Sequence, residues 1–188
     1  MVTVGIDEVG RGCWAGPLVA GAVILSEPII GLKDSKKLTK MQREQLAVEI
    51  ENTALAIGIG WVPPQELDKV GITTAVKLAM QRALEQISIA FGEVIIDGNI
   101  NYFPADRRAK AIIKADDSVP VVSAASIVAK VARDNYMAQQ AETFPAYGFD
   151  KHVGYGTKLH QEMLRLHGIT DLHRRSFKPI QLLLEPGI

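Results

Sequence analysis

The residues in this sequence best suited to chemistry are carboxylates that follow apolar segments. Asp7 and Glu8 end one such segment, Asp97 ends a second, and Asp116 and Asp117 follow a third. If these segments are strands of an open α/β sheet, their carboxyl ends are where ligand sites gather. Clustered carboxylates need a counter-charge, and no lysine or arginine lies inside the first two segments. The pattern indicates either a site for hard divalent cations such as Mg²⁺ or a set of ordinary strand-to-turn junctions.

Asp7 and Glu8 are neighbours, so in a regular strand their side chains point to opposite faces. Both can reach one site only if the backbone turns at Glu8, and Val9-Gly10-Arg11-Gly12 predicts such a turn. Two divalent ions about 3.5–4 Å apart could there activate a water and stabilise the leaving oxygen of a phosphodiester.

The elements that must position these acids follow from the hydrophobic periodicity. Strands are expected at residues 2–6, 18–25, 54–61, 94–97 and 111–114, and helices at residues 39–52, 73–90, 121–141 and 157–167. The strand at 54–61 carries alanine and glycine on one face, which permits the close approach of a helix. Strands followed by alternating helices and strands indicate an α/β fold, a sheet layered with helices, in a single domain.

Composition excludes several classes of protein. A single cysteine, Cys13, excludes an internal disulfide framework and a cysteine-rich zinc site. No apolar run approaches the roughly 20 residues that span a bilayer. No basic leader precedes Asp7, so no signal peptide is expected. We expect a cytoplasmic protein without membrane association.

Basic residues gather near the C-terminus although lysine plus arginine and aspartate plus glutamate both total 21. Residues 150–178 hold six lysines and arginines against three acids, together with all four histidines. Such a segment could follow a phosphate backbone, or it could be a solvated surface. His160 and His167, seven residues apart on one expected helix, are interpreted as surface residues near phosphate rather than as metal ligands.

One motif is misleading. Gly10-Arg11-Gly12-Cys13-Trp14-Ala15 matches the pattern of a dinucleotide-binding turn, but that turn requires a helix to begin at once. Gly16-Pro17 and a strand-like run follow instead, so we reject a Rossmann site. No P-loop motif is present in the sequence.

Taken together, the segments closely resemble bacterial ribonuclease HII, the type 2 ribonucleases H. The matching segments run in the family's order along nearly the whole chain. They are Gly5-Ile6-Asp7-Glu8-Val9-Gly10-Arg11-Gly12, Ala15-Gly16-Pro17, Asp34-Ser35-Lys36-Lys37-Leu38, Ile96-Asp97-Gly98-Asn99, Lys114-Ala115-Asp116, Ser123-Ala124-Ala125-Ser126-Ile127-Val128-Ala129-Lys130-Val131-Ala132-Arg133-Asp134, Gly154-Tyr155-Gly156-Thr157 and His173-Arg174-Arg175-Ser176-Phe177.

The resemblance implies a ribonuclease H-like fold, a mixed five-stranded sheet flanked by helices, with a small helical C-terminal segment. It also implies an endoribonuclease that hydrolyses the RNA strand of RNA–DNA hybrids and nicks 5′ of single ribonucleotides in duplex DNA. The products would carry 5′-phosphate and 3′-hydroxyl ends. Asp7, Glu8, Asp97 and Asp116 correspond to carboxylates that hold two Mg²⁺ or Mn²⁺ ions.

Other matches imply substrate contacts. The Gly10-Arg11-Gly12 turn corresponds to the segment that reads the ribose 2′-hydroxyl, the group that distinguishes RNA from DNA. Tyr155 corresponds to a tyrosine that packs on the neighbouring deoxyribose. Ser35, Lys36 and Lys37 resemble contacts to backbone phosphates, which position a substrate without reading its sequence. Residues from about 145 to 188 would contact the duplex, and a monomer is expected.

The chain departs from the family's pattern in places. Val153 stands where the family commonly has a lysine, and Lys151 could compensate. Asp117 beside Asp116 leaves open which of the two would face the metals. Asp134 is a weaker alternative, expected to pair with a neighbouring cation. The chain also ends soon after Phe177, which predicts a reduced C-terminal tail.

Two rival functions remain open from the sequence. One is a duplex-binding module of the same fold without catalysis, against which the intact set of acids argues. The other is a metal-dependent phosphohydrolase for small molecules, against which the basic C-terminal segment and Tyr155 argue. The related ribonuclease HIII is a poorer match, because it carries an additional N-terminal domain.

Overall fold

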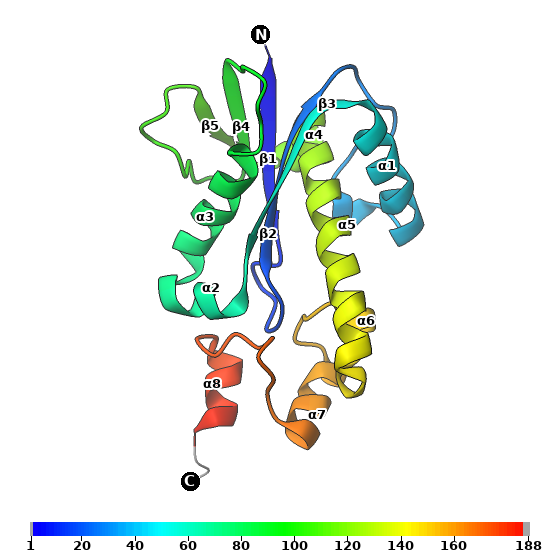
Figure 1. Cartoon of the computed structure of the whole chain (residues 1–188), viewed down its shortest axis with the longest axis vertical. Coiled ribbons are helices and arrows are strands. Elements are labelled where there is room, and N and C mark those ends of the chain that lie inside the picture. The colour runs from blue at the N-terminus through cyan, green and yellow to red at the C-terminus, as the bar shows by residue number, and fades with distance from the viewer. Residues whose placement is uncertain (1, 186–188) are drawn as a thin grey trace.

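A mixed five-stranded sheet forms the centre of the molecule, as the resemblance implies (Figure 1). The computed structural model describes residues 2–185. The strands are β1 (Thr3–Val9), β2 (Leu18–Leu25), β3 (Ala54–Val62), β4 (Glu93–Asp97) and β5 (Ala109–Ile112), in the order β3-β2-β1-β4-β5. β1 pairs with β2 antiparallel and with β4 parallel, so the first strand in sequence is the middle strand of the sheet.

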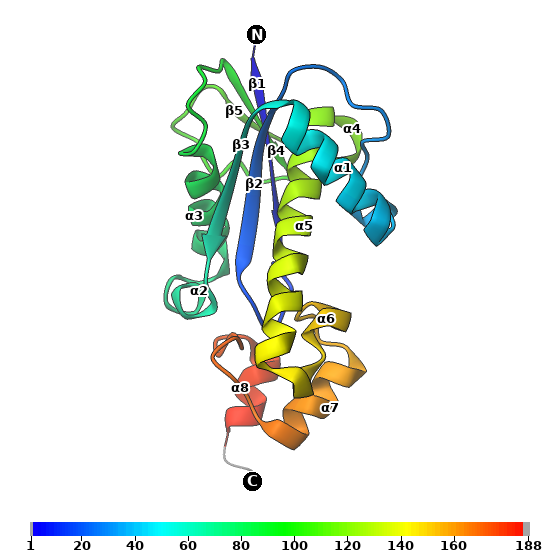
Figure 2. The same ribbon diagram turned by 45° about the vertical axis from the view of Figure 1, so that its right-hand side comes forward.

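Helices cover both faces of this sheet (Figure 2). On one face lie α2 (Pro64–Val70) and α3 (Ile72–Leu84), and on the other lie α1 (Lys40–Thr53) and α5 (Pro120–Thr143). Coverage on both sides explains why seven of the eight residues of β2 are buried.

The glycines of β3 bring α3 close to the sheet, as the sequence predicts. A Cβ atom at Gly58 or Gly60 would overlap the backbone carbonyls of Ala83 and Ala79 in α3. Only glycine at these two positions therefore allows α3 to pack this closely on β3.

Local signals fix most of the helix ends. Thr39 caps α1 in a reciprocal capping box with Gln42, at the predicted position. The helix expected at 73–90 is wrong at both ends, because α3 begins at Ile72 and ends at Leu84. A separate helix, α2, precedes it. Proline in its first turn favours the start of α2, and Gly71 with a φ of 78° separates the two helices.

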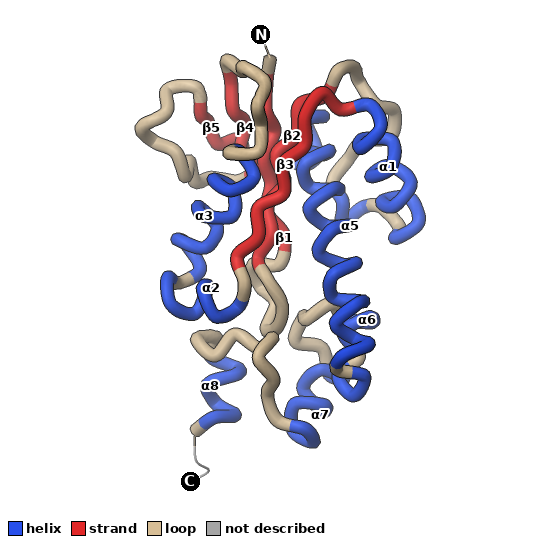
Figure 3. The backbone as a smooth tube through the Cα atoms, viewed as in Figure 1, coloured by secondary structure: helices blue, strands red, loops and turns tan. Residues whose placement is uncertain are grey.

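The C-terminal segment packs against the far half of α5, beyond the end of the sheet (Figure 3). It contains η2 (Pro145–Tyr147), α6 (Phe149–His152), α7 (Lys158–His167) and α8 (Lys178–Leu184). Its apolar cluster includes Met137 of α5 and Ala15, which follows β1. The predicted helical C-terminal segment is therefore present and attached to the first loop of the chain. Across residues 2–185, no helix has the length and apolarity needed to cross a membrane.

Candidate active site

Four of the predicted acids come from three elements that meet beside the middle of the sheet. Asp7 and Glu8 lie near the end of β1, Asp97 is the last residue of β4, and Asp116 lies in α4 (Ala115–Ser118). The parallel register sets Ile6 beside Ile96, so Asp7 and Asp97 follow at matching ends of adjacent strands. The backbone N–H of Asp116 donates to Asp97 Oδ1 at 3.1 Å.

Asp7 is the most buried of these acids, with 5% of its surface exposed. Burial raises the pKa of its carboxyl well above the usual value, and the charges of Glu8 and Asp97 raise it further. The Glu8 N–H donates to Asp7 Oδ1 at 2.8 Å, and a hydrogen bond with Ser126 also opposes the rise in pKa. Asp7 is thus a carboxylate held in a site that disfavours its charge.

Glu8 shares this electrostatic environment although the strand does not turn there. The prediction of a turn at Glu8 was wrong, because pairing with β2 continues to Val9 and the backbone first departs at Gly10, with a φ of 87°. Burial raises the pKa of Glu8; the Arg11 guanidinium, 3.8 Å away, opposes that rise, and the Asp97 charge adds to it.

Asp116 and Asp117 face different surroundings. Asp116 is 6% exposed, and its pKa is raised by burial and by the Asp97 charge. Asp117 pairs instead with Lys37 at 2.7 Å, and this hydrogen bond lowers its pKa. Of the two adjacent acids, Asp116 is therefore the one that lies with Asp97.

Lysines in the turn that contains η1 (Ser35–Lys37) lie beside these acids. The sequence did not suggest that these lysines pair with the acids. Lys36 Nζ lies 3.4 Å from Asp116 Oδ2 and 3.7 Å from Asp34 Oδ1. Ser35 is buried, and its hydroxyl shares a 2.9 Å hydrogen bond with the hydroxyl of Ser126, which in turn hydrogen-bonds to Asp7. The Lys36 side chain remains largely exposed.

Two buried arginines hold the glycine turn that follows β1. Arg174 Nε donates to the Gly16 carbonyl at 3.0 Å and its NH1 donates to the Arg11 carbonyl at 3.2 Å. Arg133 donates to the carbonyls of Ala15, Pro17 and Val153 at 2.8–3.0 Å. These contacts satisfy loop carbonyls that have no strand partner.

Sequence reasoning missed both arginines. The sequence gives Arg133 no role of its own and places Arg174 in the basic segment expected at the surface, but both are fully buried. The single cysteine, Cys13, is also fully buried inside this turn.

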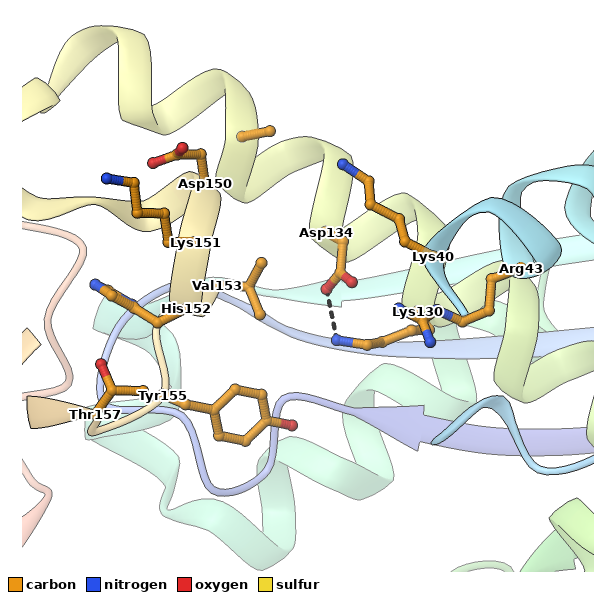
Figure 4. Close-up of a pocket in the computed structure, with 11 residues that line it drawn as sticks. Lys40, Arg43, Lys130, Asp134, Asp150, Lys151, His152, Val153, Tyr155 and Thr157 are labelled. Atoms are coloured by element: carbon orange, nitrogen blue, oxygen red, sulfur yellow. Dashed lines mark hydrogen bonds and ion pairs between the residues drawn. The ribbon is translucent and has the colours of Figure 1, made fainter. Parts of the chain in front are cut away.

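Tyr155 lies at the edge of a cavity of about 390 Å³ with several cations on its wall (Figure 4). Its side chain is partly exposed, and Lys130 Nζ lies 5.9 Å from the ring centroid. Asp134 pairs with Lys130 at 2.7 Å, as expected of an acid that serves a neighbouring cation. The wall of the cavity is formed by Lys40, Arg43, Lys130, Asp134, Ala138, Asp150, Lys151, His152, Val153, Tyr155 and Thr157.

Three of the four histidines are buried, contrary to the surface interpretation. His152, His160 and His173 have at most 6% of their surface exposed, whereas His167 is exposed at the last position of α7. His160 lies on the same helix, but at its first turn, where Trp14 and Phe149 cover it. The two histidines do lie on one helix, but only His160 is covered by other residues.

No three His, Cys, Asp or Glu side chains within residues 2–185 form a ready-made metal cluster. The donor chemistry of the four acids nevertheless suits a hard divalent cation, because Mg²⁺ takes oxygen ligands and commonly uses only one or two carboxylates with water and substrate phosphates.

A mixed sheet in this strand order, flanked by helices and carrying acids at the ends of adjacent strands, is the architecture of the ribonuclease H-like class. The ribonuclease HII family model matches residues 4–180 of this chain. A ribonuclease HII from Marinomonas sp. (strain MWYL1) is 50% identical over 183 residues, covering 96% of this chain and 92% of the relative. The chain belongs to the ribonuclease HII family, whose members are metal-dependent endonucleases acting on RNA–DNA substrates.

Solved structures agree with this assignment. The ribonuclease H2 of Pyrococcus horikoshii OT3 superposes with a TM-score of 0.84 at 27% identity, covering 98% of both chains. The ribonuclease HII of Archaeoglobus fulgidus, solved in a complex with PCNA, gives a TM-score of 0.78 at 30% identity, covering 95% of this chain and 96% of that one. Both share the mixed sheet and its flanking helices.

Proposed function

We propose that this chain cuts the RNA strand of RNA–DNA hybrids and nicks duplex DNA on the 5′ side of single ribonucleotides. The products are a 5′-phosphate and a 3′-hydroxyl. The observation that carries the proposal is that the charge of Asp97 acts on Asp7, on Glu8 and on Asp116, so the four carboxyls lie within electrostatic reach of one another.

The four carboxylates are the proposed ligands of two divalent ions, Mg²⁺ or Mn²⁺. Burial and mutual repulsion raise the pKa of Asp7, Glu8 and Asp116, so a bound cation would relieve an existing electrostatic cost. When bound, such ions supply activation of the attacking water and stabilisation of the leaving 3′-oxygen. No side-chain nucleophile is needed.

The remaining proposed contacts position the ribonucleotide. Backbone groups of Gly10, Arg11 and Gly12 would meet the 2′-hydroxyl, because the two glycines that flank Arg11 let backbone amides and carbonyls approach a sugar closely. The Tyr155 ring, partly exposed, would pack on the deoxyribose that follows. Beside that ring, Lys130 and the other cations of the cavity in Figure 4 would follow the phosphate backbone.

We further propose that the C-terminal segment belongs to the same catalytic domain and that the protein acts as a monomer. The shared apolar cluster of Ala15, Met137 and Phe149 supports one cooperative unit. A single unfolding transition and a monomer mass by light scattering are expected.

The decisive experiment uses a DNA duplex that contains one ribonucleotide, incubated with purified protein and Mg²⁺ or Mn²⁺. We expect a single nick 5′ of the ribonucleotide, no cut in the all-DNA duplex, and no nick with Asp7→Asn or Asp97→Asn. Binding without a nick at any metal concentration would instead support a non-catalytic duplex-binding module.

The salt dependence of binding separates a polymer substrate from a small one. Duplex affinity should fall steeply as salt rises, since each phosphate contact releases counterions. Salt-independent affinity, with turnover of small phosphoesters, would support the small-molecule phosphohydrolase.

A further inference from the structure

A chain of hydrogen bonds through two buried histidines ends on the backbone of Tyr155. The Thr170 N–H lies 2.8 Å from His173 Nδ1, His173 Nε2 lies 3.0 Å from His160 Nε2, and His160 Nδ1 lies 2.9 Å from the Tyr155 carbonyl oxygen. His160 and His173 have at most 2% of their surface exposed, so water cannot substitute for these partners.

The two ends of the chain determine where every proton lies. A backbone N–H can only donate, so we assign His173 Nδ1 as the acceptor of the Thr170 N–H; the Thr170 hydroxyl, 3.0 Å from the same nitrogen, can also donate to it. A neutral His173 then carries its proton on Nε2. That proton faces His160 Nε2, which must accept it. His160 therefore carries its own proton on Nδ1 and donates it to the Tyr155 carbonyl.

Only neutral rings satisfy this arrangement. A protonated His173 would set a second N–H against the Thr170 N–H, and a protonated His160 would set its Nε2–H against that of His173. Burial lowers the pKa of both histidines to about 4, which is consistent with neutral rings at neutral pH.

The third buried histidine holds the residues before Tyr155. The Gly154 N–H donates to His152 Nδ1 at 3.2 Å, which leaves the His152 Nε2–H to donate to the Tyr147 carbonyl at 2.8 Å. His152 also stacks on His160, with ring centroids 4.4 Å apart and planes 13° from parallel.

This support acts on a loop that is strained. Val153 has a φ of 43°, a left-handed conformation that costs a residue with a Cβ about 1–2 kcal/mol. A loop in that conformation persists only where its surroundings hold it. On this loop, the Tyr155 carbonyl accepts hydrogen bonds from the His160 ring and from the Thr157 N–H.

We infer that His160 and His173, anchored by Thr170, are positioning residues that fix the backbone of Tyr155 and thereby the angle at which its ring meets the substrate. The inference rests on the proposed contact of Tyr155 with the nucleic acid. In this role His160 and His173 act only through the Tyr155 backbone, and neither as metal ligands nor as acid–base groups of the reaction.

The first test requires no activity. Long-range ¹H–¹⁵N spectra of histidine-labelled protein at neutral pH distinguish the protonated ring nitrogen of each histidine from the unprotonated one. We expect the Nδ1–H form for His160 and the Nε2–H form for His173, with exposed His167 as the internal reference. The Nε2–H form for His160, or a charged ring in either residue, would overturn the inference.

The second test compares His173→Leu with His173→Gln. Leucine leaves His160 Nε2 without a donor, so His160 can change tautomer and release the Tyr155 carbonyl. Glutamine can still accept from Thr170 and donate to His160. We expect His173→Leu to lower kcat/KM at an RNA–DNA junction about tenfold, the scale of one hydrogen bond, and His173→Gln to restore most of it.

Tyr155→Ala separates the inference from the proposed function. If the histidines act through the Tyr155 ring, His173→Leu should have little added effect in the Tyr155→Ala background. Equal losses in both backgrounds would overturn the positioning role while leaving the nuclease proposal intact. If Tyr155→Ala itself cleaves the junction normally, the proposed substrate contact fails, and the histidines then have no ring to position.

Discussion

Mild acid should destabilise this protein because three of its four histidines are buried, among them the hydrogen-bonded pair His160 and His173. Burial lowers the pKa of His160 and of His173 to about 4 in the folded state. In the unfolded chain both residues return to an ordinary pKa of about 6.5. Between these two values the unfolded state binds protons that the folded state does not. The stabilising contribution is therefore complete above about pH 6.5 and is lost as the pH falls towards 4.

The size of the effect follows from these values. At pH 5 the unfolded pKa lies about 1.5 units above the solution pH, and one unit corresponds to about 1.4 kcal/mol, so each histidine costs about 2 kcal/mol. The pair costs about 4 kcal/mol, a large part of the roughly 5–15 kcal/mol that stabilises most folded domains.

Urea unfolding at pH 7 and at pH 5, without divalent metal, measures this loss. The acids at the candidate site act in the opposite direction, because the pKa of Asp7, Glu8 and Asp116 is raised in the folded state and protonation relieves their repulsion. Comparing variants removes that contribution, since it is common to all of them. His173→Gln should lose about 2 kcal/mol less than the unsubstituted protein between the two pH values, whereas His167→Gln should match it.

An equal loss of stability in all three proteins between pH 7 and pH 5 would contradict this prediction. An NMR titration in which His173 gains its proton near pH 6.5 in the folded protein would contradict it as well. Either result would mean that the folded state accepts the charge without breaking the hydrogen bonds described above.

Other substitutions test separate parts of the site. Without divalent metal, Asp7→Asn should raise the melting temperature by about 2–4 °C, as expected for a gain of about 1 kcal/mol, because it removes a buried charge that faces Glu8 and Asp97. Asp116→Asn should abolish cleavage while Asp117→Asn, which loses only the pairing with Lys37, should keep most of it; the reverse outcome in a nicking assay would exchange their roles. Gly10→Ala should cost more than about 2 kcal/mol in urea unfolding, since its φ is positive and its Cβ would overlap the Arg133 guanidinium. Val153→Lys, which adds a cation to the cavity wall, should steepen the dependence of log affinity on log salt by about one unit.

The sequence predicted the acids but not their full environment. Asp7, Glu8 and Asp97 could be identified because each lies at the end of an apolar segment. That identification needed only the expectation that these segments form strands. The mixed five-stranded sheet came from the resemblance and not from periodicity, and neither predicted the strand order. Asp116 and Asp117 could not be separated, because the distinction depends on Lys37, which lies 80 residues away in sequence.

The buried polar residues escaped prediction for a related reason. Arginine and histidine are usually exposed, so a basic C-terminal segment was interpreted as surface. Arg133 is buried because it satisfies the Pro17 carbonyl 116 residues earlier, and Arg174 satisfies that of Gly16, 158 residues earlier. Such partners are carbonyls of irregular loops, which every residue type supplies, so no sequence pattern marks them.

Two different parts of the structure hold the candidate site in place: the sheet and the C-terminal segment. The sheet carries Asp7 and Asp97, and its register places them whatever the C-terminal segment does. The glycine turn and the Tyr155 loop depend instead on that segment, through Arg174 and the bridge between Ala15 and His173. Disturbing the C-terminal segment should therefore weaken the proposed preference for ribonucleotides in DNA before it displaces the four proposed metal-binding acids. A variant that loses junction specificity but still cleaves a long hybrid would be the direct consequence of this division.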